Sequence, residues 1–146
     1  MIDYKVCKDN IIRDKKNHPK IDNEVFQNLV IKKQKNEMSK SEETLYGQCI
    51  MTLVEIILNC PKLKFQKEEV KDDCKLEAYI AICEGLPKYF KPELGSKAYS
   101  YAYRIGYTAM IHVLEKNNKY NEMMKTLIET YNDIFGIIKD EESNLM

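Results

Sequence analysis

Apolar and polar residues along this chain recur with the period of an α-helix, and no strand-like alternation lasts more than a few residues. From Asn23 onward, Phe26, Leu29 and Val30 recur at helical spacing before a polar run begins. This pattern predicts a short amphipathic helix that ends near Met38.

Two longer helices are predicted next. The first covers residues 42–59, with Ser41 as its N-cap and acidic side chains in its first turn, where the helix dipole favours them. Pro61 ends it, and a short connection follows. The second covers residues 67–86 and stops before Pro87.

The last two helices are predicted over residues 97–117 and 121–135, with Gly136 as the C-cap of the final one. At about 100° per residue, one narrow polar stripe runs along the helix of residues 97–117 while most other positions are apolar or aromatic. The stripe consists of Ser100, Arg104, Thr108 and His112.

These elements predict an all-α fold, a compact bundle of about five helices. At 146 residues the chain is large enough to bury a core without disulfides or metal. We expect a flexible arm over residues 1–22, rich in Lys, Asn and Asp, a helical domain over residues 23–136, and an acidic and apolar tail over residues 137–146.

Four tyrosines, Tyr99, Tyr101, Tyr103 and Tyr107, lie close together just after a turn rich in Pro and Gly. Their rings could stack on unpaired bases, with Arg104 contacting a phosphate, or they could pack in the core with their hydroxyls reaching solvent. We expect Tyr99 and Tyr103 to be buried and Tyr101 to be presented at the surface beside Arg104.

The charge balance limits how the chain could bind nucleic acid. There are 23 basic and 23 acidic residues, so the formal net charge is zero. A free-standing nucleic-acid binder usually shows a basic excess or a basic face. Any DNA contact made by this chain is therefore expected to be local or assisted by a partner.

The sequence contains no run of 18 apolar residues and no signal-peptide pattern, so we expect a cytoplasmic protein that does not enter membranes.

Its five cysteines show no C-x-x-C spacing and are expected to be reduced and mostly buried. We expect no metal, because His18 and His112 are the only histidines and no ligand spacing is present. No cofactor and no catalytic residues are predicted; a small helical enzyme using Arg104, Thr108 and His112 remains a minor alternative.

One resemblance gives these patterns a context. An acidic helix, a turn of the form F-x-P-E-x-G and an aromatic helix follow one another in the order and spacing of conserved region 2 of bacterial sigma factors. The stretch from Asp73 to Leu114 resembles that region, especially in the short late-transcription sigma factors of T4-like phages. The matching residues are Asp73, Cys74, Glu77, Ala78, Ile82, Cys83, Leu86, Phe90, Pro92, Glu93, Gly95, Ser100, Tyr101, Ala102, Tyr103, Arg104 and Ala109.

The resemblance implies two binding surfaces. In the family, the acidic helix docks on the clamp helices of the largest subunit of core RNA polymerase, and the aromatic helix holds melted promoter DNA. It implies polymerase contacts from Asp73, Glu77, Tyr79, Cys83 and Glu84. It implies promoter DNA contacts from Lys97, Tyr101, Arg104, Thr108 and His112, with Tyr101 stacking on a flipped adenine. From the residues alone, the carboxylates could also be an ordinary solvated helix face, and His112 a surface histidine.

The chain also departs from the family. Arg104 and Ile105 stand where bacterial sigma factors place paired tryptophans, and His112, Val113 and Glu115 stand where phage late sigmas are basic. Lys91 replaces the aspartate that usually follows Phe90.

Three hypotheses follow. The first is a sigma-like promoter-specificity subunit that binds core RNA polymerase and stabilises a melted A/T-rich promoter, in the cytoplasm of a host cell. The second is a helical regulator that binds polymerase or a sigma factor without melting DNA. The third is the small enzyme mentioned above. The C-terminal tail could also contact a sliding clamp or co-activator or could simply be solvated, and its candidate residues are Ile137, Ile138, Asp140, Glu141, Glu142 and Leu145.

Overall fold

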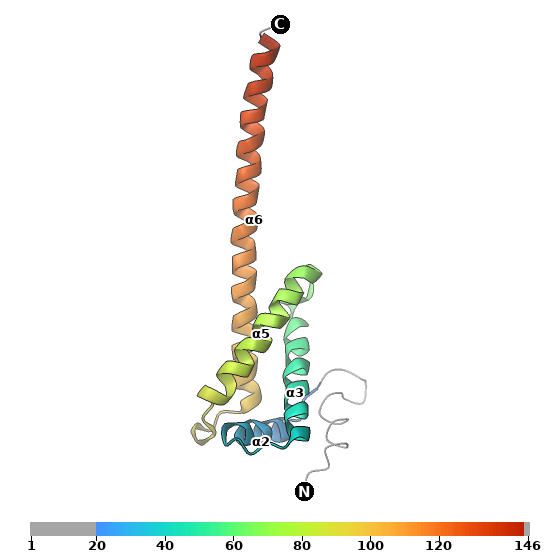
Figure 1. Cartoon of the computed structure of the whole chain (residues 1–146), viewed down its shortest axis with the longest axis vertical. Helices are drawn as coiled ribbons and strands as arrows, with labels where there is room; N and C mark the ends of the chain where they lie inside the picture. The colour runs from blue at the N-terminus through green and yellow to red at the C-terminus, as the bar shows by residue number, and fades with distance from the viewer. Residues whose placement is uncertain (1–19, 145–146) are drawn as a thin grey trace. The chain divides into compact units, whose positions relative to one another are not determined.

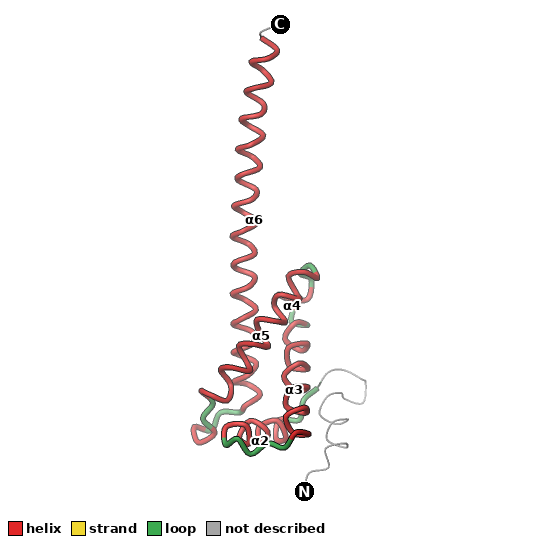
Figure 2. The backbone as a smooth tube through the Cα atoms, viewed as in Figure 1, coloured by secondary structure: helices red, strands yellow, loops and turns green. Residues whose placement is uncertain are grey.

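The computed structural model describes residues 20–144, with side chains described as far as Ile137. This part of the chain is all-α, as predicted, with five α-helices, one short 3-10 helix and no strand. Figure 1 shows the helices in chain order, and Figure 2 shows how short most of the connections between them are. Most of the predicted arm of residues 1–22 lies outside the described residues.

Helix α2 spans Asn23–Gln34 and is capped by Asp22, whose Oδ1 accepts hydrogen bonds from two backbone N–H groups of the first turn. It ends earlier than the predicted Met38. The chain leaves the helix through Asn36, whose φ of 54° lies in the left-handed region that asparagine tolerates better than most residues.

Helix α3 spans Lys40–Leu58, and its N-cap is Ser39 rather than the predicted Ser41. Ser39 Oγ accepts from the Glu42 N–H at 3.2 Å, and Glu42 Oε1 accepts from the Ser39 N–H at 3.3 Å. A reciprocal capping box requires a carboxylate or amide side chain three positions after the cap. Glu42 stands at that position relative to Ser39, whereas Thr44 stands there relative to Ser41.

The connection after Pro61 contains a short helix that was not predicted, α4 over Pro61–Lys64, which buries Leu63. Helix α5 spans Glu68–Tyr89 and passes through Pro87, where we expected it to have ended. Pro87 removes only one hydrogen bond of the last turn, and α5 continues just two residues beyond it.

A 3-10 turn over Pro92–Leu94 leads into helix α6, which spans Ala98–Asn144. Two separate helices were predicted here, with Gly136 as a C-cap. Both expectations are wrong, because Gly136 keeps a helical conformation and the segment around Asn118 contains no glycine or proline to break the helix.

The described residues form two compact units, divided between Val113 and Leu114 within α6. In the first unit, α2 and α3 pack against α5, and α2 also packs against α3 (Figure 1). The core consists of fully buried side chains from the four longer helices and from α4. The largest are Phe26, Val30, Ile50, Leu53, Val54, Ile57, Leu63, Ile82, Leu86 and Met110.

Candidate nucleic-acid interface

Close packing of α6 against α3 and α5 sets the position of the predicted DNA-contacting residues. Gly106 lies where α6 meets both helices, and a Cβ at this residue would lie 2.7 Å from Ile57 Cδ1 and 3.0 Å from Ile82 Cδ1. On the same side of α6, the Cys74 thiol donates to the Met110 carbonyl at 3.8 Å. The opposite side of this part of α6 is therefore the side that faces away from the core.

The turn between α5 and α6 is held by two glutamines of α2. Gln34 Nε2 donates to the carbonyls of Pro87, at 3.2 Å, and of Phe90, at 2.5 Å. Gln27 Oε1 accepts from the Ala98 N–H at 3.3 Å, which satisfies one of the N–H groups at the start of α6. Helix α2 thus fixes both ends of the turn that joins the two candidate binding helices.

Four of the five predicted DNA-contacting residues line one open groove of about 560 Å³ on the surface of α6. They are Tyr101, Arg104, Thr108 and His112, and Ile105, Ala109 and Ala81 of α5 form its apolar part. Arg104, Thr108 and His112 are exposed, whereas Tyr101 is half-buried. The groove combines an arginine, a hydroxyl, an imidazole and a tyrosine ring with a small apolar wall, a combination that could hold an unstacked base and an adjacent phosphate.

Tyr101 is positioned by the turn. Its ring lies 5.9 Å from that of Phe90 at an interplanar angle of 56°, and Phe90 is itself buried. This tilted contact orients Tyr101 at the edge of the groove and leaves the ring only partly accessible.

The expectation that Tyr99 and Tyr103 are core residues is wrong, because both are half-buried. Together with Tyr107 they form a row of rings along a different face of α6, with centroid distances of 6.3 and 6.4 Å between successive rings. Partial burial raises the pKa of the Tyr99 and Tyr103 hydroxyls. Tyr107 lies in this row and does not line the groove.

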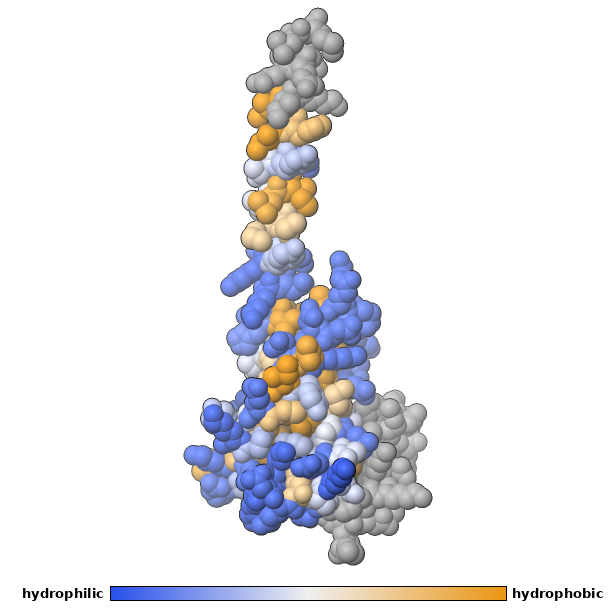
Figure 3. Space-filling model, viewed as in Figure 1, coloured by the Kyte–Doolittle hydropathy of each residue, from blue (hydrophilic) through white to orange (hydrophobic). Residues whose placement is uncertain are grey.

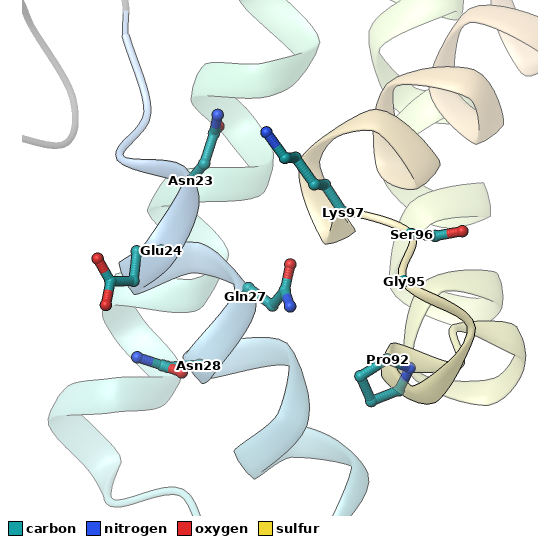
Figure 4. Close-up of a pocket in the computed structure, with 8 residues that line it drawn as sticks. All are labelled: Asn23, Glu24, Gln27, Asn28, Pro92, Gly95, Ser96 and Lys97. Atoms are coloured by element: carbon teal, nitrogen blue, oxygen red, sulfur yellow. The ribbon is translucent and has the colours of Figure 1, made fainter.

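Lys97, the fifth predicted DNA-contacting residue, does not line the groove. It is exposed at the start of α6 and borders a second, polar pocket of about 460 Å³ between α2 and the turn. Figure 4 shows its side chain directed toward Asn23 of α2, with Gln27 alongside. The structure therefore separates Lys97 from the other four residues.

The residues predicted to bind polymerase fall into two groups on α5. Asp73, Glu77 and Glu84 are exposed, and their spacing places them within about 40° of one another around the helix. Tyr79 and Cys83 are half-buried on another side. The charge that Cys83 would carry as a thiolate, and a hydrogen bond between the two side chains, raise the pKa of the Tyr79 hydroxyl.

Sequence inspection missed two apolar side chains beside the three carboxylates. Leu76 and Ile80 are 59% and 41% exposed, and around α5 they lie between the acidic residues and Cys83. Their helical spacing relative to Asp73 and Glu77 was visible in the sequence. Their exposure was not, because α5 has apolar residues around most of its circumference.

Four of the cysteines lie within the described residues and carry free thiols. Cys49 and Cys74 are buried, and burial raises the pKa of Cys49 to about 12 and that of Cys74 to about 11. Both are therefore protonated and unreactive at neutral pH. Cys7 lies outside the described residues.

Comparisons with protein-family models, curated proteins and solved structures find no match to this chain.

The described residues contain no group of three or more His, Cys, Asp and Glu side chains arranged to hold a metal ion. None of the helices described is long and apolar enough to cross a membrane. Apart from Ile137, the tail residues proposed to contact a sliding clamp lie outside the part of the chain whose side chains are described.

Proposed function

We propose that this chain is a sigma-like promoter-specificity subunit that binds core RNA polymerase and stabilises a melted A/T-rich promoter element. It would act in the cytoplasm of a host cell and would carry no catalytic chemistry of its own. The proposal rests on two surfaces of the first unit, the groove on α6 and the acidic face of α5.

The groove is the observation that carries the DNA part of the proposal. Tyr101, Arg104, Thr108 and His112 line one surface, and a ring beside a guanidinium suits a base and its phosphate. In this mechanism Tyr101 stacks on a flipped base while Arg104 contacts the backbone on its 3′ or 5′ side. Stacking of a base on an aromatic ring contributes about 1–3 kcal/mol, which can hold one flipped base but cannot by itself open a duplex.

The polymerase part of the proposal is supported by the face of α5 formed by Asp73, Glu77, Glu84, Leu76 and Ile80. All five side chains are exposed, and at about 100° per residue the three carboxylates lie together with Leu76 and Ile80 along one side of them. A basic helical surface with apolar side chains would complement it, since buried apolar area contributes affinity and opposite charges fix the orientation of the partners.

The test is a binding and opening assay with core RNA polymerase and an A/T-rich promoter fragment carrying a pre-melted bubble. Glu77→Lys should weaken polymerase binding by about tenfold or more, because it places a like charge against a basic partner. Tyr101→Ala should leave polymerase binding intact and shorten the lifetime of the open complex by roughly fivefold to 100-fold, as expected for the loss of one stacked base.

Matched controls come from the same unit. Glu55→Lys reverses an exposed charge on α3, and Tyr103→Ala removes a half-buried ring outside the groove. Neither should change polymerase binding or open-complex lifetime. The proposal is wrong if the wild-type protein binds no core polymerase. It is also wrong if Glu55→Lys weakens polymerase binding as much as Glu77→Lys, or if Tyr103→Ala shortens the open-complex lifetime as much as Tyr101→Ala.

The second candidate is a regulator that binds polymerase or a sigma factor without melting DNA. It is favoured by the half-buried state of Tyr101, whose ring already contacts Phe90, and by Arg104 and Ile105 at the tryptophan positions of the family. This candidate predicts polymerase binding that depends on Glu77, with no stabilisation of the bubble by wild type and no effect of Tyr101→Ala.

A further inference from the structure

The second unit carries a surface that the proposed function does not use. Between Asn117 and Ile137, α6 presents a row of large apolar side chains that are all between 37% and 66% exposed. Figure 3 shows apolar side chains recurring along this segment. The row consists of Tyr120, Met123, Met124, Leu127, Ile128, Tyr131, Ile134, Phe135 and Ile137.

The row follows the spacing of a coiled coil. Successive steps of four, three, four and three residues connect its central members, Tyr120, Met124, Leu127, Tyr131 and Ile134. This average spacing of 3.5 residues is that of the a and d positions of a heptad repeat. The five apolar positions span residues 120–134, about two heptads, and Asn117 at the preceding a position extends the register to about three.

Of the remaining heptad positions, the flanking e and g positions are mostly apolar, although Asn121 and Thr130 among them are polar and uncharged. Met123, Ile128, Phe135 and Ile137 flank the central row at positions e and g. The rings of Tyr131 and Phe135 stack on each other, with centroids 6.3 Å apart. The outward positions are polar or glycine, and they are Asn118, Lys119, Glu122, Lys125, Thr126, Glu129, Asn132, Asp133 and Gly136.

The exposed area is large enough for a stable interface. Burying an aromatic side chain removes about 150–250 Å² from water, so a half-exposed ring still offers on the order of 100 Å². Nine large side chains exposed to this degree offer on the order of 800 Å² per copy. This matches the roughly 800 Å² per partner of a standard specific interface.

The chemistry of the surface favours a second copy of this chain over an unlike partner. From Tyr120 to Ile137, the positions facing a partner carry no charged side chain. The same surface on another copy therefore meets no like charge, as an isologous contact requires. Asn117, three residues before Tyr120, occupies an a position. A single polar residue at an a position sets the register and oligomeric state of a coiled coil.

We propose that residues 117–137 associate with the same segment of other copies of this chain in a coiled coil. Apolar residues at e and g as well as a and d widen the surface, which suits a bundle of more than two helices as well as a pair. The proposal is independent of the proposed function, because its residues lie outside the first unit and its test contains neither polymerase nor DNA.

Sedimentation velocity of the full chain over about 1–100 μM tests the proposal. Wild type should sediment as a concentration-dependent oligomer. Leu127→Asp should dissociate it, because a carboxylate at a d position would be buried between apolar side chains. Asn132→Asp adds the same charge at an outward, exposed position and should leave the oligomer intact.

A milder variant separates loss of association from loss of helix. Leu127→Ala removes apolar area while keeping a strong helix former, and it should raise the dissociation constant by about tenfold or more. A wild-type chain that stays monomeric at 100 μM, or an oligomer that survives Leu127→Asp, would overturn the proposal. Equal dissociation by Leu127→Asp and Asn132→Asp would overturn it as well.

Discussion

The missing side chain at residue 106 sets how closely α6 approaches α3 and α5. Gly106→Ala should destabilise the first unit by about 1 kcal/mol. Overpacking of the core costs about 1–3 kcal/mol of stability, and the better helix propensity of alanine offsets up to about 1 kcal/mol of that cost. Ile57 and Ile82, which the new methyl group would meet, are fully buried and have little room to move.

The free energy of unfolding, measured with urea, checks this expectation against Gly85→Ala. A Cβ at Gly85 would have Ile105 Cδ1 as its nearest neighbour, at 3.6 Å, which is ordinary van der Waals contact. Gly85→Ala should therefore be neutral or stabilising. If the Gly106→Ala variant is as stable as Gly85→Ala, the packing of α6 against α3 and α5 does not depend on the absence of a side chain at residue 106.

Buried thiols predict that stability falls in alkaline solution. Burial raises the pKa of Cys49 from 9.0 to about 12, so the folded state holds this proton at pH values where the unfolded state has released it. The stability contributed by the protonated thiol is complete below pH 9 and is lost as the pH rises from 9 toward 12, by about 1 kcal/mol per pH unit for one such group.

Urea unfolding at several pH values between 7 and 11 measures this loss. Cys49→Ala removes the thiol, and its stability should fall less steeply above pH 9 than that of wild type. Identical slopes for the two proteins would mean that Cys49 does not contribute to the alkaline loss.

At the scale of elements, the 3-10 turn between α5 and α6 depends on one backbone conformation. Gly95 has a φ of 77°, in the left-handed region, and beyond its two chain neighbours no atom lies within 4 Å of where its Cβ would be. Gly95→Ala should therefore destabilise the first unit by about 1–2 kcal/mol through backbone strain alone.

Gly95→Asn provides the matched comparison, because asparagine adopts the left-handed region more readily than alanine. In the same urea measurement, Gly95→Asn should lower the free energy of unfolding clearly less than Gly95→Ala does, although asparagine has the larger side chain. A larger loss for Gly95→Asn would point to crowding rather than strain.

At the scale of the whole molecule, the balance of 23 basic and 23 acidic residues limits free DNA binding. Without a basic excess, the chain alone should bind duplex or bubble DNA with a dissociation constant no tighter than about 10⁻⁴ M at physiological salt. In the proposed function, core polymerase would supply the missing affinity by holding the DNA nearby. Fluorescence anisotropy with labelled bubble DNA measures the affinity of the chain for DNA with and without core polymerase. Tight binding to DNA by the chain alone would contradict the expectation that its DNA contacts need a partner.

The sequence by itself determined that the chain folds into helices, where the longer ones lie, and which edge of α6 is polar. Helical periodicity predicted the exposed Arg104, Thr108 and His112, because three- and four-residue steps keep side chains on one face whatever packs behind them. It also located the glycine of the turn, since the turn pattern places Gly95 where a left-handed residue is needed.

Helix ends were predicted less well because they depend on competing local partners. Ser39 and Ser41 are both plausible caps by residue type, and the Glu42 carboxylate favours Ser39. The same carboxylate also pairs with Lys32 of α2 at 2.7 Å, a contact between helices that sequence spacing does not reveal.

Tertiary structure alone decided how the aromatic and apolar residues are divided. Tyr99 and Tyr103 looked like core residues, but the core side of α6 is occupied by small residues such as Ala102 and Gly106, which allow close helix packing and leave the rings half-exposed. Beyond Leu114, the apolar stripe expected to join the bundle is exposed instead. Periodicity fixes which residues share a helix face, whereas the neighbours of that face are fixed only when distant segments pack together.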